Sequence, residues 1–277
     1  MLHQDGHFNA ADELDIFYQS WRPDGPPKAI FLIVHGLGEH SGRYQNYVDH
    51  FAPRGYALYA LDTRGHGRSG GRRGHVSRFD DYVIDVRQFY ELVRAANPDG
   101  KIIMLGHSLG SLIALAYASR YPDGLAGVIA SATALRDALD VPGWLRSMAG
   151  GLSKIAPALA MDNGVKTERI SHDPAVVAAY DSDPLVHHVG TLRLAAEVEI
   201  VRSDLLGRAR DWTLPLLMLH GADDRICLPA GARAFYDQTD HARVELRFYQ
   251  GLYHEIHNEI GKQAVFKDIE EWLARRI

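Results

Sequence analysis

Short apolar runs recur along this 277-residue chain, and longer segments with helical spacing separate them. Apolar runs without regular polar alternation are typical of strands buried on both faces of a mostly parallel sheet. Leu14–Trp21 differs, because its apolar and polar residues alternate, and we expect it to form an antiparallel strand at the sheet edge. The predicted buried strands are Ala29–His35, Ala57–Asp62, Lys101–Gly106, Gly127–Ala130, Leu216–His220 and Val244–Tyr249.

Two of the segments between these runs have clear helical signals. Phe79–Asn97 places apolar residues at intervals of three and four, the spacing of one buried helix face. Leu109–Tyr121 is rich in Ala and Leu and stops before Pro122, where a helix is expected to end. Strands that alternate with helices predict an α/β fold, with a mostly parallel central sheet and helices on both of its faces.

The alternation breaks between residues 135 and 210, where no convincing buried strand occurs. Within this segment, Val141–Met161 is strongly apolar and carries only Arg146 and Lys154 as charged residues. We interpret residues 135–210 as an all-helical cap inserted into one α/β domain that comprises residues 1–134 and 211–277.

Composition narrows the class of protein further. The single cysteine, Cys227, excludes an internal disulfide and any Cys-x-x-Cys metal site. The net charge of −5 argues against nucleic acid as a partner. The first residues lack a basic region followed by an apolar run, and no run of about 18 apolar residues occurs. These features predict a cytoplasmic enzyme.

Gly106-His107-Ser108-Leu109-Gly110 lies between a predicted strand and a predicted helix. A G-x-S-x-G sequence in this setting is typical of a nucleophile elbow, a sharp turn that lifts the serine above the sheet. Such a turn strains the serine backbone, and side chains at Gly106 and Gly110 would collide across it. We therefore predict that Ser108 is a nucleophile. The alternative is a serine that only caps the helix.

A serine nucleophile needs a base. In chains with this type of elbow, an acidic residue and then a histidine follow the serine in the sequence. Asp223 and Asp224 both follow the strand Leu216–His220, and spacing does not choose between them. His254 follows the strand Val244–Tyr249, where the base is expected, and His257 is its rival. A zinc pair is not indicated, because the spacing His-Glu-x-x-His is absent.

Acyl transfer also needs donors for the oxyanion that develops on the substrate. The loop His35–Glu39 contains two glycines, so its backbone can approach a substrate and the N–H of Leu37 can point into the site. The N–H of Leu109, directly after the serine, is the second predicted donor. Cys227, close to the acid candidates, is expected to be an inert buried thiol.

With these residues in place, the chain resembles the monoacylglycerol lipase branch of the α/β-hydrolase superfamily over nearly its whole length. Leu37 occupies a position that a smaller residue often holds in that branch. The resemblance implies an α/β-hydrolase fold with a helical cap, and it favours Asp224 as the acid and His254 as the base. The motifs that carry it are His35–Tyr44 (HGLGEHSGRY), Asp62–Ser69 (DTRGHGRS), the elbow, Tyr180–Leu185 (YDSDPL), Gly221–Cys227 (GADDRIC) and Gly251–His257 (GLYHEIH).

The resemblance also implies a substrate, a small lipid ester, and no metal or organic cofactor. A polar recess for the glycerol end would be lined by Glu39, Arg43, His107, Tyr180 and His257. The alternative for Glu39 and Arg43 is a pair that stiffens the loop, and for His107 a buried histidine beneath the elbow.

An apolar cap face of this family meets lipid surfaces, which implies peripheral membrane contact. The alternative is a face that packs on the core. Candidates for the lipid-facing side chains are Trp144, Leu145, Met148, Leu152 and Ile155.

The expected reaction is hydrolysis of monoacylglycerol to fatty acid and glycerol through an acyl-enzyme on Ser108. A lysophospholipase or a general carboxylesterase would use the same residues. A peptidase of the prolyl-aminopeptidase type and a non-catalytic ligand-binding member of the scaffold are weaker alternatives. The sequence carries no signal of oligomeric state.

Overall fold

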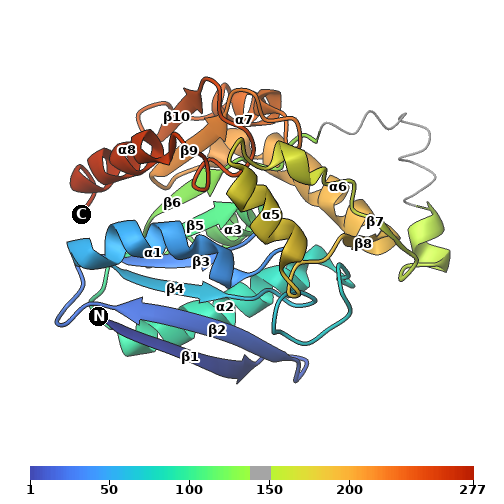
Figure 1. Cartoon of the computed structure of the whole chain (residues 1–277), viewed down its shortest axis with the longest axis horizontal. Helices are drawn as coiled ribbons and strands as arrows, with labels where there is room; N and C mark the ends of the chain where they lie inside the picture. Colours follow the sequence, from blue (N-terminus) through green and yellow to red (C-terminus); the bar gives the residue numbers. More distant parts are fainter. Residues whose placement is uncertain (138–150) are drawn as a thin grey trace.

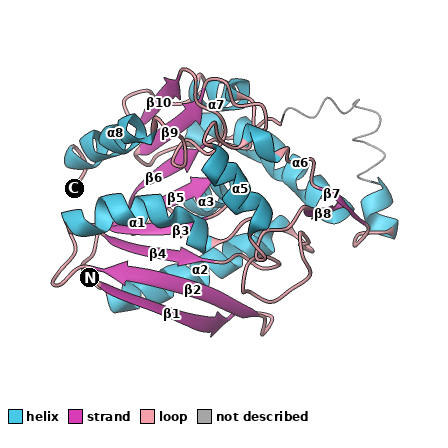
Figure 2. Cartoon of the chain, viewed as in Figure 1, coloured by secondary structure: helices cyan, strands magenta, loops and turns pink. Residues whose placement is uncertain are grey.

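The computed structural model describes residues 1–137 and 151–277, and an eight-stranded sheet forms its centre (Figures 1 and 2). The strands lie in the order β1-β2-β4-β3-β5-β6-β9-β10. The strand bounds are β1 Leu2–Asn9, β2 Asp15–Arg22, β3 Ile30–Val34, β4 Ala57–Leu61, β5 Ile102–His107, β6 Leu125–Ser131, β9 Leu216–Gly221 and β10 Val244–Tyr249.

Strands β4, β3, β5, β6, β9 and β10 run parallel, while β2 is antiparallel to both β4 and β1. The antiparallel direction predicted for the second strand is therefore confirmed, but its predicted edge position is wrong. Strand β1, which the sequence did not predict, forms the edge and pairs with β2 along its whole length, from Leu2 opposite Arg22 to Asn9 opposite Asp15. Most side chains of β1 are exposed, so its sequence lacks the apolar pattern that marks the other strands.

Helices cover both faces of the sheet, as the alternating pattern predicted (Figure 2). On one face, α1 (Gln45–Phe51) and α8 (Lys262–Ala274) bury aromatic and aliphatic side chains such as Phe51, Phe266 and Trp272. On the other face, α2 (Phe79–Ala96), α3 (Leu109–Arg120) and α7 (Pro229–Tyr236) pack against the sheet, with Phe89 and Leu112 in the core. These two apolar layers fix the sheet, and hence the loops that follow its strands.

The segment between β6 and β9 contains the predicted helices and also two short strands. β7 (Ala160–Asp162) and β8 (Val189–Thr191) form an antiparallel ribbon, so the all-helical prediction is wrong. Each has three residues, too few to show a period of two, and all of β7 is exposed. Residues 151–155 are helical, and the further helical elements are η3 (Thr167–Arg169), α5 (Pro174–Ser182), α6 (Leu192–Gly207) and η4 (Ala209–Asp211). Trp144, Leu145 and Met148 lie outside the described residues.

Two further short elements, η1 (Ser41–Tyr44) and η2 (Ala52–Arg54), flank α1. Among residues 1–137 and 151–277, no helix combines the length and the hydropathy that crossing a bilayer requires.

Candidate active site

Ser108 sits at the sharp turn between β5 and α3. Its backbone has φ 53° and ψ −120°, a strained conformation for a residue with a side chain. The turn demands glycine on both sides. A Cβ on Gly106 would lie 2.3 Å from Gly110 O, and one on Gly110 would lie 2.1 Å from Val34 O. The strand, the turn and the helix thus have the geometry of a nucleophile elbow, and the hydroxyl is presented at the N-terminus of α3.

Asp224 and His254 form a buried pair in the loops that follow β9 and β10. His254 Nδ1 donates to Asp224 Oδ2 at 2.8 Å. The other carboxylate oxygen, Oδ1, accepts the N–H groups of Ile226 at 2.8 Å and Cys227 at 3.0 Å, which fixes the carboxylate plane. Asp223 is exposed, whereas Asp224 is buried. The structure therefore brings Asp224, rather than its neighbour, to His254.

The charges of this pair reinforce each other. Burial by itself would raise the pKa of Asp224, but His254 and His220 beside the carboxylate outweigh it and hold that pKa well below its usual range. Burial would lower the pKa of His254, yet the Asp224 carboxylate and its hydrogen bond raise it above the ordinary value. A carboxylate that stays ionised thus stabilises positive charge on the imidazole.

His220 is a residue that the sequence analysis missed. Its Nε2 lies 3.2 Å from Asp224 Oδ2 and 2.9 Å from Cys227 O, beneath the acid. The only sequence signal is its place four residues before Asp224, at the end of an apolar strand.

Cys227 is buried, as expected, and it also adjoins the nucleophile. Its Sγ lies 3.8 Å from Ser108 Oγ. Within the described part of the chain, no hydrogen bond joins Ser108 Oγ to His254 Nε2. The hydroxyl must therefore turn from the sulfur toward the imidazole before it can give up its proton. Burial, and next the Asp224 carboxylate, raise the pKa of the thiol, which keeps Cys227 protonated.

Leu37 and Leu109 line the same cavity as Ser108. Leu109 opens α3, where the first N–H groups have no partner within the helix. Leu37 follows Gly36, and a Cβ on Gly36 would lie 3.1 Å from Ser108 Cβ, so this loop passes directly over the serine. Neither amide donates a hydrogen bond to any residue in the ranges 1–137 and 151–277.

A buried group of charges lies beside the serine. Arg43 Nη2 donates to both oxygens of Glu255 at 2.7 and 2.6 Å, and Arg43 Nε lies 3.3 Å from Glu39 Oε2. Glu39 Oε1 accepts from Gly36 N at 2.5 Å and from Tyr44 Oη at 2.9 Å. Burial, together with Glu255, raises the pKa of Glu39. Glu255 was not among the predicted residues, although it directly follows His254 in the histidine motif.

Glu39, His107 and Tyr180 line the cavity at Ser108, whereas Arg43 and His257 do not. The Arg43 guanidinium carbon lies 4.5 Å from the Tyr180 ring centroid, behind the ring that faces the cavity. His257 is fully buried between the Tyr44 ring at 5.0 Å and the His107 ring at 4.9 Å. Its burial lowers its pKa to about 3, so it is neutral and packs in the core. The expectation of direct substrate contact thus lacks support for Arg43 and His257.

The cavity over the serine has a volume of about 1200 Å³. Polar side chains such as Glu39, His107 and His254 line it beside Ser108, and the inserted segment adds a wall of apolar and charged side chains. These include Leu152 and Ile155, two of the five apolar residues predicted to face lipid. The described apolar side chains of that wall are Leu152, Ile155, Leu159, Met161, Val165, Ile170, Leu192, Leu194, Val198 and Ile200.

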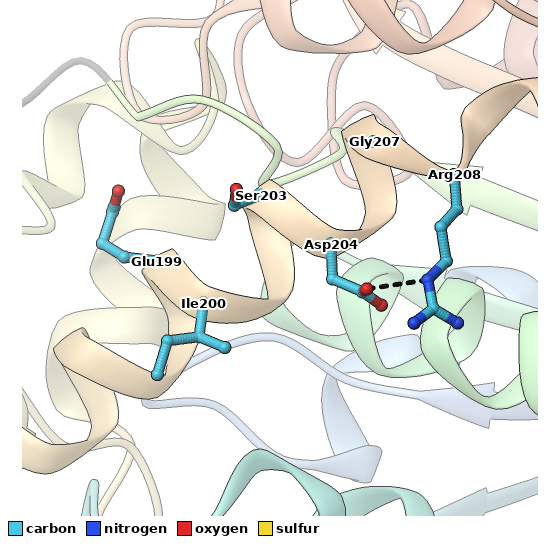
Figure 3. Close-up of a pocket in the computed structure, with 6 residues that line it drawn as sticks. All are labelled: Glu199, Ile200, Ser203, Asp204, Gly207 and Arg208. Atoms are coloured by element: carbon cyan, nitrogen blue, oxygen red, sulfur yellow. Dashed lines mark ion pairs between the residues drawn. The ribbon is translucent and has the colours of Figure 1, made fainter.

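A second depression of about 700 Å³ lies on the outer side of α6 (Figure 3). It is formed by one helix, from Glu199 to Arg208, and an ion pair one helical turn apart joins Arg208 Nε to Asp204 Oδ1 at 2.8 Å. It holds no candidate nucleophile with a base, so the chemistry belongs to the cavity over Ser108. Among the described residues, no group of three His, Cys, Asp or Glu side chains is arranged to hold a metal ion.

A sheet of this strand order that lifts a serine at the end of β5 defines the serine hydrolases of the α/β-hydrolase fold. The family model described as serine aminopeptidase, S33, matches residues 25–261. A monoacylglycerol lipase of Mycolicibacterium smegmatis is 37% identical over 264 residues, which cover 95% of this chain and 94% of that protein. The chain therefore belongs to the S33 family of α/β-hydrolases, among the serine hydrolases that resemble monoacylglycerol lipase.

Two further comparisons bear on the fold and on the activity. A soluble variant of the monoglyceride lipase of Saccharomyces cerevisiae, solved with a substrate analogue, is 26% identical with a TM-score of 0.89. The match covers 100% of this chain and 96% of that one. A phospholipase of Bacillus subtilis is 28% identical over 250 residues, which cover 90% of this chain and 95% of that protein. The family thus includes relatives that act on different lipid esters.

Proposed function

We propose that this chain hydrolyses carboxylic esters, with monoacylglycerol as its main substrate, through an acyl-enzyme on Ser108. The observation that carries the proposal is the strained Ser108 at the floor of a 1200 Å³ cavity, beside a histidine held by a buried carboxylate. The monoacylglycerol lipase of M. smegmatis, similar over nearly the whole chain, supports the choice of substrate.

In the proposed reaction, Ser108 Oγ attacks the ester carbonyl carbon while His254 Nε2 takes the hydroxyl proton. The Asp224 carboxylate keeps the Nδ1 proton in place and stabilises the imidazolium that forms. The N–H groups of Leu37 and Leu109 donate to the oxyanion of the tetrahedral intermediate. When the intermediate collapses, the C–O bond to the alcohol breaks and His254 returns the proton to the leaving oxygen.

Deacylation repeats these roles with water. His254 takes a proton from the water molecule as its oxygen attacks the acyl carbon, and a second tetrahedral intermediate forms. Its collapse breaks the bond to Ser108 Oγ, which recovers the proton, and the fatty acid leaves.

The polar side chains beside Ser108 suit a neutral glycerol headgroup. Glu39 and Tyr180 line the cavity and carry oxygen atoms that suit a diol. Two carboxylates, Glu39 and Glu255, share the single guanidinium of Arg43, so these side chains carry no spare positive charge for a phosphate. We propose that Arg43 holds these side chains in place from behind.

A lysophospholipid is the second candidate substrate, because arginine side chains without a carboxylate partner also line the same cavity. Neither Arg169 nor Arg225 has an ion pair within the described residues, and Arg169 is half-buried. An arginine without a carboxylate partner is suited to bind a phosphodiester. The phospholipase among the similar proteins supports keeping this alternative.

The decisive experiment compares substrates on the wild-type enzyme and on Ser108→Ala. We expect Ser108→Ala to lower turnover of short p-nitrophenyl esters by several orders of magnitude while the circular dichroism spectrum stays native. Unchanged turnover would sink the assignment. The kcat/KM values for monoacylglycerol, lysophosphatidylcholine and amino-acid amides of matched purity then distinguish lipase, phospholipase and peptidase activity. Labelling of the wild type by a fluorophosphonate excludes a non-catalytic binding protein.

We also propose that the segment of residues 135–210 acts as a cap that meets lipid surfaces. Several of its large apolar side chains are exposed beside the cavity, with Ile155 83% and Ile200 63% accessible. Exposed apolar residues that cluster at a cavity entrance are typical of a surface that binds lipid or a partner.

A further inference from the structure

Three histidines outside the proposed mechanism lie between the inserted segment and the loop that carries the amide of Leu37. His187 belongs to the inserted segment, His66 follows β4, and His35 ends the run of β3. The ring centroid of His66 lies 4.8 Å from that of His187 and 5.2 Å from that of His35. His66 is fully buried, so the three rings form one packed row.

At one end of the row, His35 fixes the peptide unit that joins Gly36 to Leu37. His35 Nε2 accepts the N–H of Thr63 at 2.9 Å, so its proton lies on Nδ1, which donates to Gly36 O at 2.7 Å. Burial lowers the pKa of His35 to about 4 and keeps this pattern at neutral pH. Because a peptide is planar, a fixed Gly36 carbonyl also fixes the direction of the Leu37 N–H.

At the other end, His187 holds the next part of the loop. The backbone N–H of His187 donates to Gly38 O at 2.9 Å. Gly38 has φ +79°, and a Cβ there would lie 2.4 Å from His187 O, so the two backbones are in direct contact. The His187 ring accepts the Val189 N–H on Nδ1 at 3.3 Å, and its Nε2 donates to Gly65 O at 3.2 Å.

We propose that His187 is a positioning residue for the reaction: its ring packs on His66, and His66 packs on His35, so the side chain supports the loop His35–Gly38 and holds the Leu37 N–H toward the oxyanion. The inference rests on the proposed ester hydrolysis and on Leu37 as a donor. Because the oxyanion exists only along the reaction path, loss of this support lowers kcat and leaves ground-state binding, and hence KM, almost unchanged.

The test compares His187→Leu, which keeps the volume but removes the donor to Gly65 O, with His187→Gln, which retains a side-chain N–H. The substrate is p-nitrophenyl butyrate, a soluble short ester. Removal of one oxyanion donor costs about 10²–10³ in kcat, and a displaced donor should cost about tenfold. We expect this loss for His187→Leu with KM within about twofold, and recovery of at least about half of kcat for His187→Gln.

His75→Ala is the matched control. His75 Nδ1 bonds Thr191 Oγ1 at 3.0 Å, which also docks the inserted segment on the loop after β4. Within the described residues, the His75 ring has no ring contact with His66, His35 or His187. We expect wild-type kcat from His75→Ala. Equal losses in His75→Ala and His187→Leu, or a change in KM alone, would show that His187 only supports the segment and would overturn the proposal.

A second readout follows the oxyanion itself. A trifluoromethyl ketone forms a charged hemiketal with the serine, whereas the matching methyl ketone binds largely as the neutral ketone. His187→Leu should weaken the first inhibitor by about the factor lost in kcat and leave the second unchanged. Equal weakening of both would contradict the proposal. If His187→Leu does not fold, a tenfold loss of kcat in His187→Gln also contradicts it. An inactive wild type would instead reject the proposed function.

Discussion

At the scale of single residues, the carboxylate of Asp224 is held on both oxygens. The backbone N–H groups of Ile226 and Cys227 fix Oδ1, and His254 donates to Oδ2. A carboxylate fixed in this way sets the tautomer and the orientation of the imidazole. Its neighbour Asp223 is exposed and has no such bond to His254. Two adjacent residues therefore differ in role: Asp224 orients the histidine, and Asp223 is a charge on the surface.

This difference predicts the outcome of two amide substitutions. Asp224→Asn should lower kcat/KM on p-nitrophenyl butyrate by about 10⁴, because the amide favours the wrong imidazole tautomer. Asp223→Asn should stay within about twofold of wild type, because it changes an exposed group only. Both rates are measured at one pH with the folded fraction checked by thermal unfolding. A larger loss at Asp223 would assign the acid to that residue.

His254 also predicts the pH dependence of the reaction. Its pKa is raised, since the Asp224 carboxylate and its hydrogen bond outweigh burial. Only the neutral imidazole can accept the Ser108 proton, so kcat/KM should fall with decreasing pH, at a midpoint above the ordinary histidine value of about 6.5. Asp224→Asn removes the charge and should move the midpoint of its residual activity to lower pH. A pH–rate profile with a wild-type midpoint below about 6 would contradict this.

At the scale of elements, the sequence predicted best those elements whose buried side chains follow a clear period. Helix α2 was predicted as Phe79–Asn97 and is Phe79–Ala96, because its apolar residues face the sheet at helical intervals. Strand β1 was missed, since pairing to β2 rather than burial of its side chains holds it in place. The ribbon β7–β8 was missed for the same reason: its stability comes from contacts distant in the chain.

The close packing at the nucleophile elbow predicts the effect of an added side chain between α3 and the sheet. Gly110→Ala would place a Cβ 2.1 Å from Val34 O, between α3 and the sheet, and neither backbone can give way cheaply. We expect a loss of at least about 3 kcal/mol in the free energy of unfolding, together with loss of esterase activity.

Gly207→Ala is the control for this change. Gly207 ends α6, and a Cβ there would meet nothing within 4 Å. This substitution should stabilise the protein by about 0.5 kcal/mol, as alanine does in an exposed helical position. Urea unfolding of the two variants measures both effects. A stable, active Gly110→Ala variant would show that the turn tolerates a side chain.

At the scale of the whole molecule, the site combines segments that the sequence could place only in order. The motif order predicted that loops after β3, β5, β9 and β10 meet at one edge, because carboxyl ends of parallel strands share that edge. It did not predict which side chains face the cavity. His257 shares a motif with His254, yet it packs between Tyr44 and His107. Side-chain direction depends on tertiary packing, which spacing does not encode.

The exposed apolar side chains around the cavity predict that the protein binds to lipid surfaces that contain its substrate. Ile155 is 83% accessible and lines the cavity entrance, whereas Ile260, 70% accessible, lies before α8 and does not line the cavity. Burying an isoleucine side chain in lipid is worth about 1.5–3 kcal/mol. Ile155→Asp should therefore weaken binding to phosphatidylcholine vesicles at least about tenfold and slow hydrolysis of monoacylglycerol in them.

The same two positions supply the controls. Because p-nitrophenyl butyrate reaches Ser108 from solution, its turnover by Ile155→Asp should match wild type within about twofold. Ile260→Asp loses the same apolar side chain at an unrelated surface, so its vesicle binding should not change. Co-sedimentation with vesicles and turnover of both substrates distinguish these outcomes. If Ile155→Asp and Ile260→Asp bind vesicles equally well, the exposed face beside the cavity does not insert into lipid, and its apolar residues serve the acyl chain within the cavity instead.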